Sequence, residues 1–176
     1  MPVILPVNDK YPKMGNNCFI APNATLVGDV VMGDECSIWF NAVIRGDVNS
    51  IRIGNKVNIQ DGCILHGTYQ KAKTTIGNNV SVGHNAIVHG CTIHDNVLIG
   101  MGAIVMDDAE IGSNSIIAAG AVVLEGTKIE SGVIYGGIPA KKIKDIPKEL
   151  ISGQIERIAN NYIHYADWFR EVKTVV

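Results

Sequence analysis

The chain has 176 residues and a formal net charge of -2, and 18% of its residues are charged. This balance provides no basic stripe that could neutralise phosphates, so nucleic acid is not an expected partner. Nowhere do about 18 apolar residues run together, so no membrane span is predicted. Residues 1–13 lack the basic, apolar and small-residue order of a secretion signal, and the four cysteines form no C-x-x-C pair. We therefore expect a cytoplasmic protein with free thiols.

The composition indicates one narrow aliphatic core. Apolar residues make up 47% of the chain but aromatic residues only 6%, so Val, Ile, Leu and Ala must fill the interior. A chain of this length buries most of its apolar surface in a single core.

From residue 20 onward, an apolar residue recurs at intervals of six, with two longer intervals and one shorter one. The residue four places after each of these anchors is usually small or β-branched, which gives two inward positions per hexad. The anchors are Ile20, Leu26, Met32, Ile38, Ile44, Ile53, Ile59, Leu65, Ile76, Val82, Val88, Ile93, Ile99, Val105, Ile111, Ile117, Val123, Ile129 and Tyr135.

A period of six is typical of short strands joined by sharp corners, and neither an α-helix nor a long alternating strand produces it. Gly, Asn and Asp just after the anchors, as in Gly54-Asn55, suit the left-handed backbone of a tight bend. Three hexads make a triangular coil, and about six coils stack at about 4.8 Å, the spacing of neighbouring strands. The predicted fold is an all-β solenoid, a parallel β-helix of hexapeptide repeats.

The period changes after Ala140. Pro147 is placed for the first turn of a helix, and apolar residues then follow at spacings of four and three from Ile151 to Val172. The sequence therefore predicts a β-helix domain over 1–140, and a linker with one α-helix packed on the β-helix over 141–176. Gly153 inside this helix costs about 1 kcal/mol relative to Ala.

Two insertions interrupt the repeat, and both follow an anchor of the same face. The interval from Ile44 to Ile53 is nine residues and contains Arg45-Gly46-Asp47, and the interval from Leu65 to Ile76 is eleven residues and begins with His66. Insertions in solenoids emerge as loops, often on a binding face.

Coil counting places two histidines in one column. His66 and His89 each follow an anchor by one residue, and their separation of 23, less the five inserted residues, is one coil of 18. They should lie about 5 Å apart at the backbone and point outward, so that both can bind one zinc ion. Arg45 occupies the same column one coil earlier.

His84 lies around the corner from this column, two residues after the anchor Val82. Asp61 has the same offset one coil beneath, with Gln60 beside it. One chain cannot easily bring His84 to the metal of the other two histidines, whereas a neighbouring prism around a threefold axis can. We therefore expect a homotrimer with three interfacial metal sites.

The three histidines, together with the R-G-D and Q-D elements, resemble the gamma-class carbonic anhydrases, which are hexapeptide-repeat proteins with a left-handed β-helix. The similarity covers residues 15–172, and the hand of the helix is taken from this resemblance. It implies that zinc, or alternatively iron (Fe²⁺) or cobalt (Co²⁺), binds to His66, His84 and His89.

The resemblance also implies roles for five other side chains. Arg45 and Asp61 would form an ion pair between subunits, Asp47 would help to hold that network, and Gln60 would contact solvent on the zinc. Tyr162 would reach the site from the C-terminal helix.

The chemistry expected from this resemblance is the zinc-dependent, reversible hydration of carbon dioxide to bicarbonate. Three neutral imidazoles would leave a fourth zinc position for water and lower the pKa of that water to about 7, as in carbonic anhydrase, so that it could attack carbon dioxide. The loop after His66, residues 67–73, contains no carboxylate that could carry protons away, so the expected turnover is low.

Three alternative functions remain open from the sequence. The same zinc site could hydrolyse thioesters, or a histidine could act as the general base of a metal-free hexapeptide acyltransferase. A non-catalytic trimeric scaffold clipped by metal is the third, although structural zinc usually has four protein ligands and only three are visible here.

Overall fold

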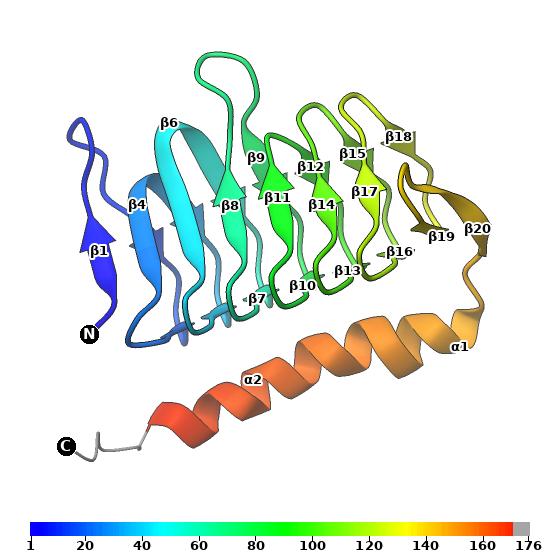
Figure 1. Cartoon of the computed structure of the whole chain (residues 1–176). Coiled ribbons are helices and arrows are strands. Elements are labelled where there is room, and N and C mark those ends of the chain that lie inside the picture. Colours follow the sequence, from blue (N-terminus) through cyan, green and yellow to red (C-terminus); the bar gives the residue numbers. More distant parts are fainter. Residues whose placement is uncertain (171–176) are drawn as a thin grey trace.

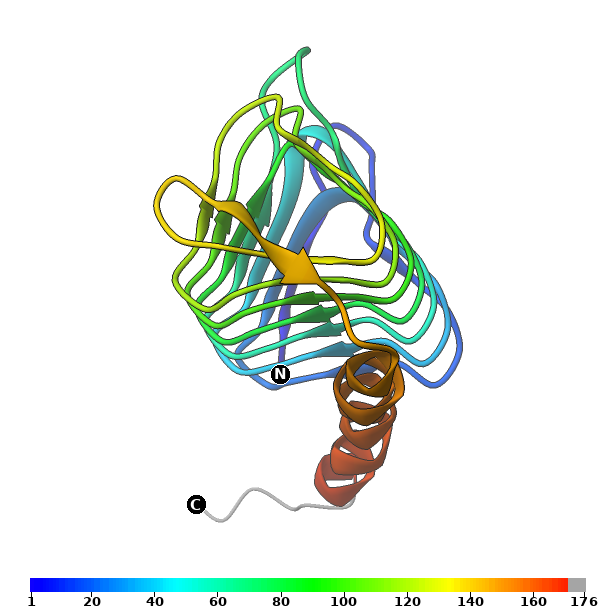
Figure 2. The same ribbon diagram turned by 90° about the vertical axis from the view of Figure 1, so that its right-hand side faces the viewer.

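The computed structural model describes residues 1–170 and has the shape of a triangular prism with one helix along its side (Figures 1 and 2). We name the three long faces of the prism A, B and C. Face C is an eight-stranded sheet in which seven strands stack in parallel, so the prism has seven turns where the sequence predicted about six. Its strands are β3 (Phe19–Ile20), β5 (Ser37–Ile38), β7 (Asn58–Ile59), β10 (Ser81–Val82), β13 (Val97–Ile99), β16 (Ser115–Ile117), β19 (Val133–Gly136) and β20 (Lys141–Asp145).

Faces A and B belong to one twelve-stranded sheet that folds around the corner between them. Two long strands, β4 (Thr25–Met32) and β6 (Val43–Ile53), cross that corner, and β1 (Val3–Leu5) and β2 (Lys13–Met14) pair with β4. Face A continues with β8 (Ile64–His66), β11 (Ile87–His89), β14 (Ile104–Val105) and β17 (Val122–Val123). Face B continues with β9 (Thr74–Ile76), β12 (Thr92–Ile93), β15 (Glu110–Ile111) and β18 (Lys128–Ile129).

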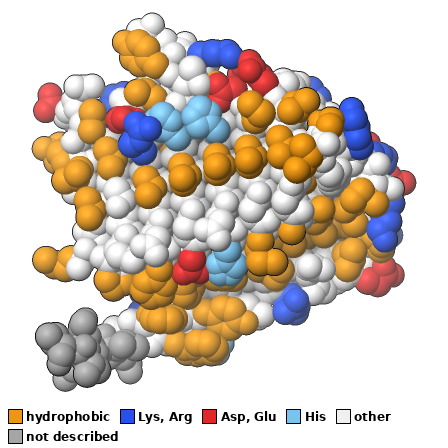
Figure 3. Space-filling model, in the orientation of Figure 1, with side chains coloured by type: hydrophobic (Ala, Val, Ile, Leu, Met, Phe, Trp, Pro, Cys, Tyr) orange, Lys and Arg blue, Asp and Glu red, His pale blue; other side chains and the backbone are white. Residues whose placement is uncertain are grey.

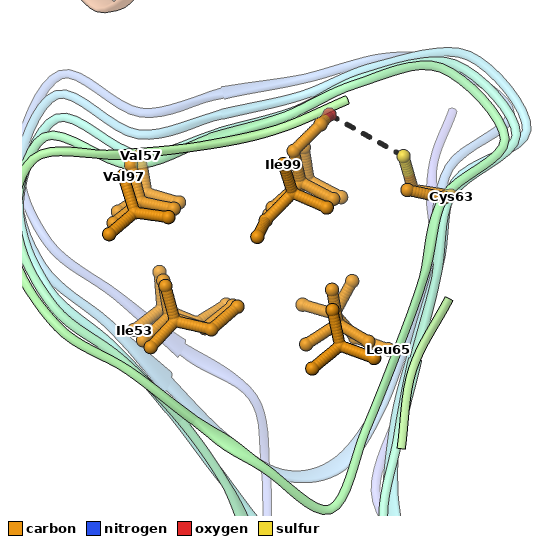
Figure 4. Close-up of a cluster of buried hydrophobic side chains, with 14 of the residues drawn as sticks. Ile53, Val57, Cys63, Leu65, Val97 and Ile99 are labelled. Atoms are coloured by element: carbon orange, nitrogen blue, oxygen red, sulfur yellow. Dashed lines mark hydrogen bonds between the residues drawn. The ribbon is translucent and has the colours of Figure 1, made fainter. Parts of the chain in front are cut away.

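The predicted hexad anchors form the core. All of them are buried except the first and the last, Ile20 and Tyr135, which are partly buried where the stack begins and ends. Figure 4 looks into this interior, where Ile53, Leu65 and Ile99 come from the three faces and point toward one another. All four cysteines are free thiols, as predicted.

Tight corners separate the strands, and many of them need a left-handed backbone. Asn41, Asn79, Asn85, Asn96 and Asn114 all have φ between 56° and 59°, a conformation that asparagine tolerates better than most residues. Seen from the C-terminal end, the chain runs clockwise while it approaches the viewer, so the β-helix is left-handed (Figure 2). Most strands have only two or three residues, so the twist that selects right-handed crossovers elsewhere accumulates little here.

The C-terminal segment differs in detail from the expected linker and single α-helix. Residues 141–145 form β20, which pairs antiparallel with β19. The helix consists of α1 (Lys148–Leu150), a π-helical stretch η1 (Ile151–Glu156) and α2 (Arg157–Arg170), and it runs back along face C (Figure 1). Val172 lies outside the described residues. Within residues 1–170, no helix is long and apolar enough to cross a membrane.

Aromatic side chains fix the helix against face C. The ring of Trp39 lies 5.2 Å from the ring of Tyr162 and 5.5 Å from that of Phe169, and Phe19 packs against both Trp39 and Phe169. These contacts bring Tyr162 close to the corner that bears His84.

Candidate functional site

His66 and His89 face each other on neighbouring strands. They end β8 and β11, and the two residues are direct register partners in the parallel ladder, as coil counting predicted. His66 Nδ1 lies 3.1 Å from His89 Nε2, and the ring centroids are 5.2 Å apart. The backbone ladder therefore sets the spacing of this histidine pair.

A carboxylate holds the outer nitrogen of each ring in the histidine pair. His66 Nε2 lies 3.1 Å from Asp47 Oδ1, and His89 Nδ1 lies 2.5 Å from Asp107 Oδ1. Asp107 also accepts a hydrogen bond from the Thr68 hydroxyl. Since each carboxylate accepts the N–H of its histidine, the two nitrogens that face each other both carry lone pairs when the rings are neutral.

Two facing lone pairs repel unless a proton or a metal cation lies between them. Burial lowers the pKa of His66, and the charges of Arg45 and His89 lower it further against the opposing effect of Asp47. The lowered pKa disfavours a proton on His66. Neighbouring nitrogens around a tetrahedral zinc ion are about 3.3 Å apart, given zinc–nitrogen bonds of about 2.0 to 2.1 Å, so the observed spacing fits a metal ion.

The carboxylates of the pair are ionised. Burial by itself raises the pKa of Asp47, but hydrogen bonds from Arg45 and His66 outweigh it and hold the pKa below its usual value. For Asp107, burial is likewise outweighed, by hydrogen bonds from Thr68 and His89. Ligating histidines commonly donate their second N–H to a carboxylate, which fixes the tautomer and raises ligand basicity.

His84 occupies the corner between faces C and A and has a carboxylate partner as well. His84 Nδ1 lies 2.8 Å from Asp61 Oδ2, so Asp61 stands beneath it as the coil count indicated. The Tyr162 hydroxyl lies 3.5 Å from His84 Nε2, and burial raises the pKa of Tyr162 to about 12. Tyr162 is therefore protonated at neutral pH. Its hydroxyl lies beside Nε2, the nitrogen of His84 that does not contact Asp61 and could bind a metal.

Gln60 is buried beside His84, with 5% of its surface exposed. Its Oε1 accepts a hydrogen bond of 3.2 Å from the His84 backbone N–H, and its Nε2 donates to Asn58 Oδ1 over 3.0 Å. Within the chain, the amide is therefore oriented by two hydrogen bonds and helps to fix the corner.

Arg45 and Asp61 have separate partners within one chain. Arg45 Nη1 lies 2.5 Å from Asp47 Oδ2, whereas Asp61 pairs with His84. Arg45 is exposed and Asp61 is partly exposed, so neither side chain is enclosed by its own chain.

The two parts of the site lie on opposite edges of face A. The histidine pair ends the strands of this face at the corner with face B, and His84 precedes β11 at the corner with face C. Within residues 1–170 of a single chain, no three His, Cys, Asp or Glu side chains are placed to hold one metal ion. His84 and the histidine pair therefore do not converge on one point within a single chain.

Apolar side chains separate these two edges. A row of hydrophobic side chains runs along face A below the histidine pair (Figure 3). Parallel pairing places five outward-facing residues in register, and Ile64, near the start of the row, is 43% exposed. The row consists of Val43, Ile64, Ile87, Ile104 and Val122.

Sequence reasoning missed Asp107 and Thr68. Asp107 lies one residue beyond the histidine column in the next coil, and its side chain reaches back to His89. Its carboxylate lies where a Cβ on Gly90 would fall, and Gly90 directly follows His89. The sequence contained a signal for this contact, because Gly90 follows the candidate ligand His89 and the acid Asp107 lies 17 residues after Gly90.

The loop after His66 is attached to later coils. Thr68 bonds to Asp107, and Lys71 Nζ lies 2.6 Å from Glu125 Oε1. The insertion is visible as the projection between β8 and β9 (Figure 1). It emerges at the corner next to the histidine pair, so both insertions border the same part of the site.

Comparison with known proteins identifies the repeat. The family described as bacterial transferase hexapeptide (six repeats) matches residues 11–46, 73–105 and 90–125. A solved structure from Bacillus cereus, described as a putative acetyltransferase, superposes with a TM-score of 0.92 at 42% identity and covers 98% of this chain and 99% of that one.

Curated relatives indicate the branch of the family. Carbonic anhydrase of Geobacillus kaustophilus is 44% identical over 97% of this chain and 93% of its own length. Gamma carbonic anhydrase 2 of Arabidopsis thaliana, a mitochondrial protein, is 40% identical over 93% of this chain, which spans 60% of that relative. The chain belongs to the gamma carbonic anhydrase family of hexapeptide-repeat proteins.

Proposed function

We propose that this chain catalyses the reversible hydration of carbon dioxide to bicarbonate, using zinc held by His66 and His89 of one subunit and His84 of the next. The observation that carries the proposal is the histidine pair, whose facing nitrogens are 3.1 Å apart while carboxylates hold the opposite ring nitrogens. The activity named for the relatives, carbonic anhydrase, agrees with it.

A homotrimer would complete the site. In a closed ring, each interface joins two different edges of the subunit. The apolar row on face A, turned toward a threefold axis, would be buried, and the edge with the histidine pair would meet the neighbour's edge with His84. Arg45 and Asp61 would then lie at the same junction, where the expected ion pair between subunits can form.

The residues of the site have distinct roles in this proposal. Zinc, when bound, supplies a Lewis acid that lowers the pKa of water to about 7. Asp47, Asp107 and Asp61 keep the three imidazoles in one tautomer and orientation, and Gln60 orients solvent while it fixes the His84 corner. Tyr162 closes the site from the helix. Iron or cobalt would suit the same imidazole ligands.

The acyltransferase alternative is less well supported by this geometry. A general base acts alone and needs one histidine within reach of its substrate. Here two histidines are fixed against each other in register, and all three have a carboxylate partner. Such an arrangement is typical of metal ligands rather than of a single base.

Mixing two defective chains tests the shared site. His84→Ala chains and His66→Ala/His89→Ala chains should each fail to bind zinc when expressed separately. In a random 1:1 mixture, an interface is intact when one chain keeps the pair and its neighbour keeps His84, so about one half times one half, roughly a quarter, of the sites should return.

Zinc content and carbon dioxide hydration should recover together in the mixture, and light scattering should give about three times the 18.9 kDa chain mass. A mixture without recovered zinc would disprove a site shared between subunits. Zinc recovery without hydration would separate the metal site from the reaction. Metal analysis of anaerobically purified protein would identify the native metal.

A further inference from the structure

Two cysteines share one column at the N-terminal end of the prism. Phe19 pairs in register with Ser37, so the residues that precede them, Cys18 and Cys36, lie one above the other in the first two coils. Cys36 is buried in the core, and Cys18 packs against the core and is partly exposed. We propose that this cysteine pair is a site of reversible oxidation, at which hydrogen peroxide converts the two thiols to a disulfide. The pair plays no part in the proposed hydration of carbon dioxide.

The two sulfur atoms hold equivalent positions in successive coils. Cys18 Sγ lies 3.2 Å from the carbonyl oxygen of Gly33, and Cys36 Sγ lies 3.1 Å from that of Gly54. Each of these glycines directly follows an anchor of face B, so the two side chains point in the same direction. Their Cα atoms are about one strand spacing, roughly 4.8 Å, apart, within the range of about 4.4 to 6.8 Å that disulfides span.

The strand that follows Cys18 is free to close the remaining gap. Within residues 1–170, β3 is the last strand of face C and pairs only with β5. Stacked Cβ atoms stand about one strand spacing apart, slightly more than the roughly 3.5 to 4.5 Å usual in a disulfide, so β3 must shift toward β5. A disulfide that forms with strain is more easily reduced, which makes the modification reversible.

The two thiols of the pair differ in reactivity. A hydrogen bond from the Cys36 thiol lowers the pKa of Cys18, whereas the same contact and burial raise the pKa of Cys36. This division agrees with the exposure of the side chains, because only Cys18 reaches solvent. Cysteines that react with oxidants combine a lowered pKa, solvent access and a second thiol nearby. Peroxide should therefore attack Cys18, and Cys36 should resolve the product.

The other two cysteines provide an internal reference. Burial raises the pKa of both Cys63 and Cys91 to about 12. Among residues 1–170, neither has a second cysteine level with it in the coil before or after. Both should react with peroxide slowly, because susceptibility follows thiolate character and exposure.

The reaction balances with one molecule of hydrogen peroxide. The Cys18 sulfur attacks one peroxide oxygen, the O–O bond breaks, and the second oxygen leaves as water, so that Cys18 becomes a sulfenic acid. The Cys36 sulfur then attacks the Cys18 sulfur, the S–O bond breaks, and the hydroxyl leaves as water with the proton of Cys36. Two thiols are oxidised to one disulfide, and the peroxide is reduced to two molecules of water. The new bond ties the first coil to the second.

Peroxide treatment of the full chain, followed by mass spectrometry, tests the pair. Trypsin releases residues 14–45 as one peptide that contains Cys18 and Cys36 but neither of the other cysteines. After oxidation, this peptide should be about 2 Da lighter than its reduced form and should resist alkylation until dithiothreitol restores both thiols. Loss of the Cys18 thiol should be at least about tenfold faster than loss of Cys63 or Cys91.

Cys36→Ser removes the resolving thiol. Cys18 should then stop at the sulfenic acid, which dimedone traps, or continue to the sulfinic acid, which adds about 32 Da. Serine suits this column because Ser115 occupies it in a later coil. Cys36→Val serves if the serine variant does not fold, since Val57 occupies the next position of the column (Figure 4). Cys63→Ser is the matched control and should form the disulfide as the wild type does.

Zinc-free and zinc-loaded protein should give the same result, because the cysteine pair lies at the corner between faces B and C and the histidines lie at the other two corners. The proposal fails if the wild-type peptide gains oxygen without losing two hydrogens. It also fails if peroxide oxidises Cys63 and Cys91 as fast as Cys18, or if it leaves all four thiols unchanged.

Discussion

The two parts of the site are built in different ways. His66 and His89 stand on adjacent strands, and the parallel ladder fixes their separation through backbone hydrogen bonds. His84 stands at a corner, where its ring is oriented by Asp61 and by Tyr162, a residue 78 positions away on the helix. The ladder therefore fixes the spacing of the histidine pair, whereas the orientation of His84 depends on packing against the C-terminal helix.

Removing a ligand of the pair should have the largest effect. His89→Ala should lower zinc affinity by more than about 100-fold, because loss of an outer-shell partner alone costs about 10- to 100-fold. The unfolding free energy of the zinc-free protein should fall by no more than about 2 kcal/mol, because the side chain lies outside the core and its removal breaks one hydrogen bond to Asp107. Zinc titration and urea unfolding measure the two quantities.

His94→Ala is the matched control for His89→Ala. His94 lies on face B with its Nε2 2.8 Å from Glu110, away from the site. A loss of zinc in this control equal to that in His89→Ala would show that the ligand set is wrong.

Replacing a carboxylate tests whether the pair relies on its outer hydrogen bonds. Asp107→Asn keeps the shape of the side chain but removes its charge, so zinc affinity should fall by about 10- to 100-fold. Asp61→Asn makes the corresponding change at the corner. If neither variant loses affinity, the carboxylates do not tune the ligands.

The same carboxylates predict the pH dependence of stability. The pKa values of Asp47 and Asp107 are lowered in the folded protein, so their contribution is complete above the unfolded value of about 3.9 and is lost as the pH falls through the folded values. Each hydrogen-bonded carboxylate contributes on the order of 2 kcal/mol.

Urea unfolding of the zinc-free protein between pH 2 and pH 7 measures this dependence. Asp107→Asn should be less stable than the wild type at pH 7, and the difference should vanish at the acid end. A constant difference across the range would contradict the assignment.

A new acid near the pair should speed proton export. Gln70 lines the polar cleft that also contains Asp47, and the loop around it has no carboxylate. Gln70→Glu should raise hydration turnover several-fold at low buffer concentration and leave zinc content unchanged, because proton transfer then no longer depends on buffer. Gln70→Ala is the control, and an equal rise in both variants would exclude proton transfer as the cause.

The smallest expected effect concerns the helix that carries Tyr162. A Cβ on Gly153 would meet no atom within 4 Å, so Gly153→Ala should stabilise the protein by about 0.5 to 1 kcal/mol. Thermal unfolding should show the gain without a change in zinc affinity. A destabilised variant would indicate that the π-helical stretch requires glycine.

The histidine column could be predicted because a solenoid repeats its backbone. Eighteen residues return the chain to the same face, so counting placed His66 against His89 and Asp61 beneath His84. The same repeat predicted which anchor side chains are buried, apart from Ile20 and Tyr135 at the two ends of the stack, which are partly buried.

The rest of the site depends on side chains that leave their columns and on contacts outside the repeat. Asp107 reaches His89 from a neighbouring position, which a column count does not detect. Tyr162 is placed by the packing of Trp39 and Phe169 against the helix, and its location came only from family resemblance. The pairing of β20 with β19 was predicted neither by counting columns nor by the family resemblance.

The antiparallel strand β20 has a consequence for how the molecule ends. A stack of identical parallel rungs presents unpaired backbone groups at its last rung, and another copy could extend it into a fibre, as in cross-β assemblies. On face C the chain reverses, and residues 141–145 occupy the last edge in the opposite direction. Lys141, Lys142 and Lys144 lie on this strand. A further parallel rung on face C would meet a strand of the opposite direction that carries the exposed Lys141 and Lys144, and both features disfavour growth from β20.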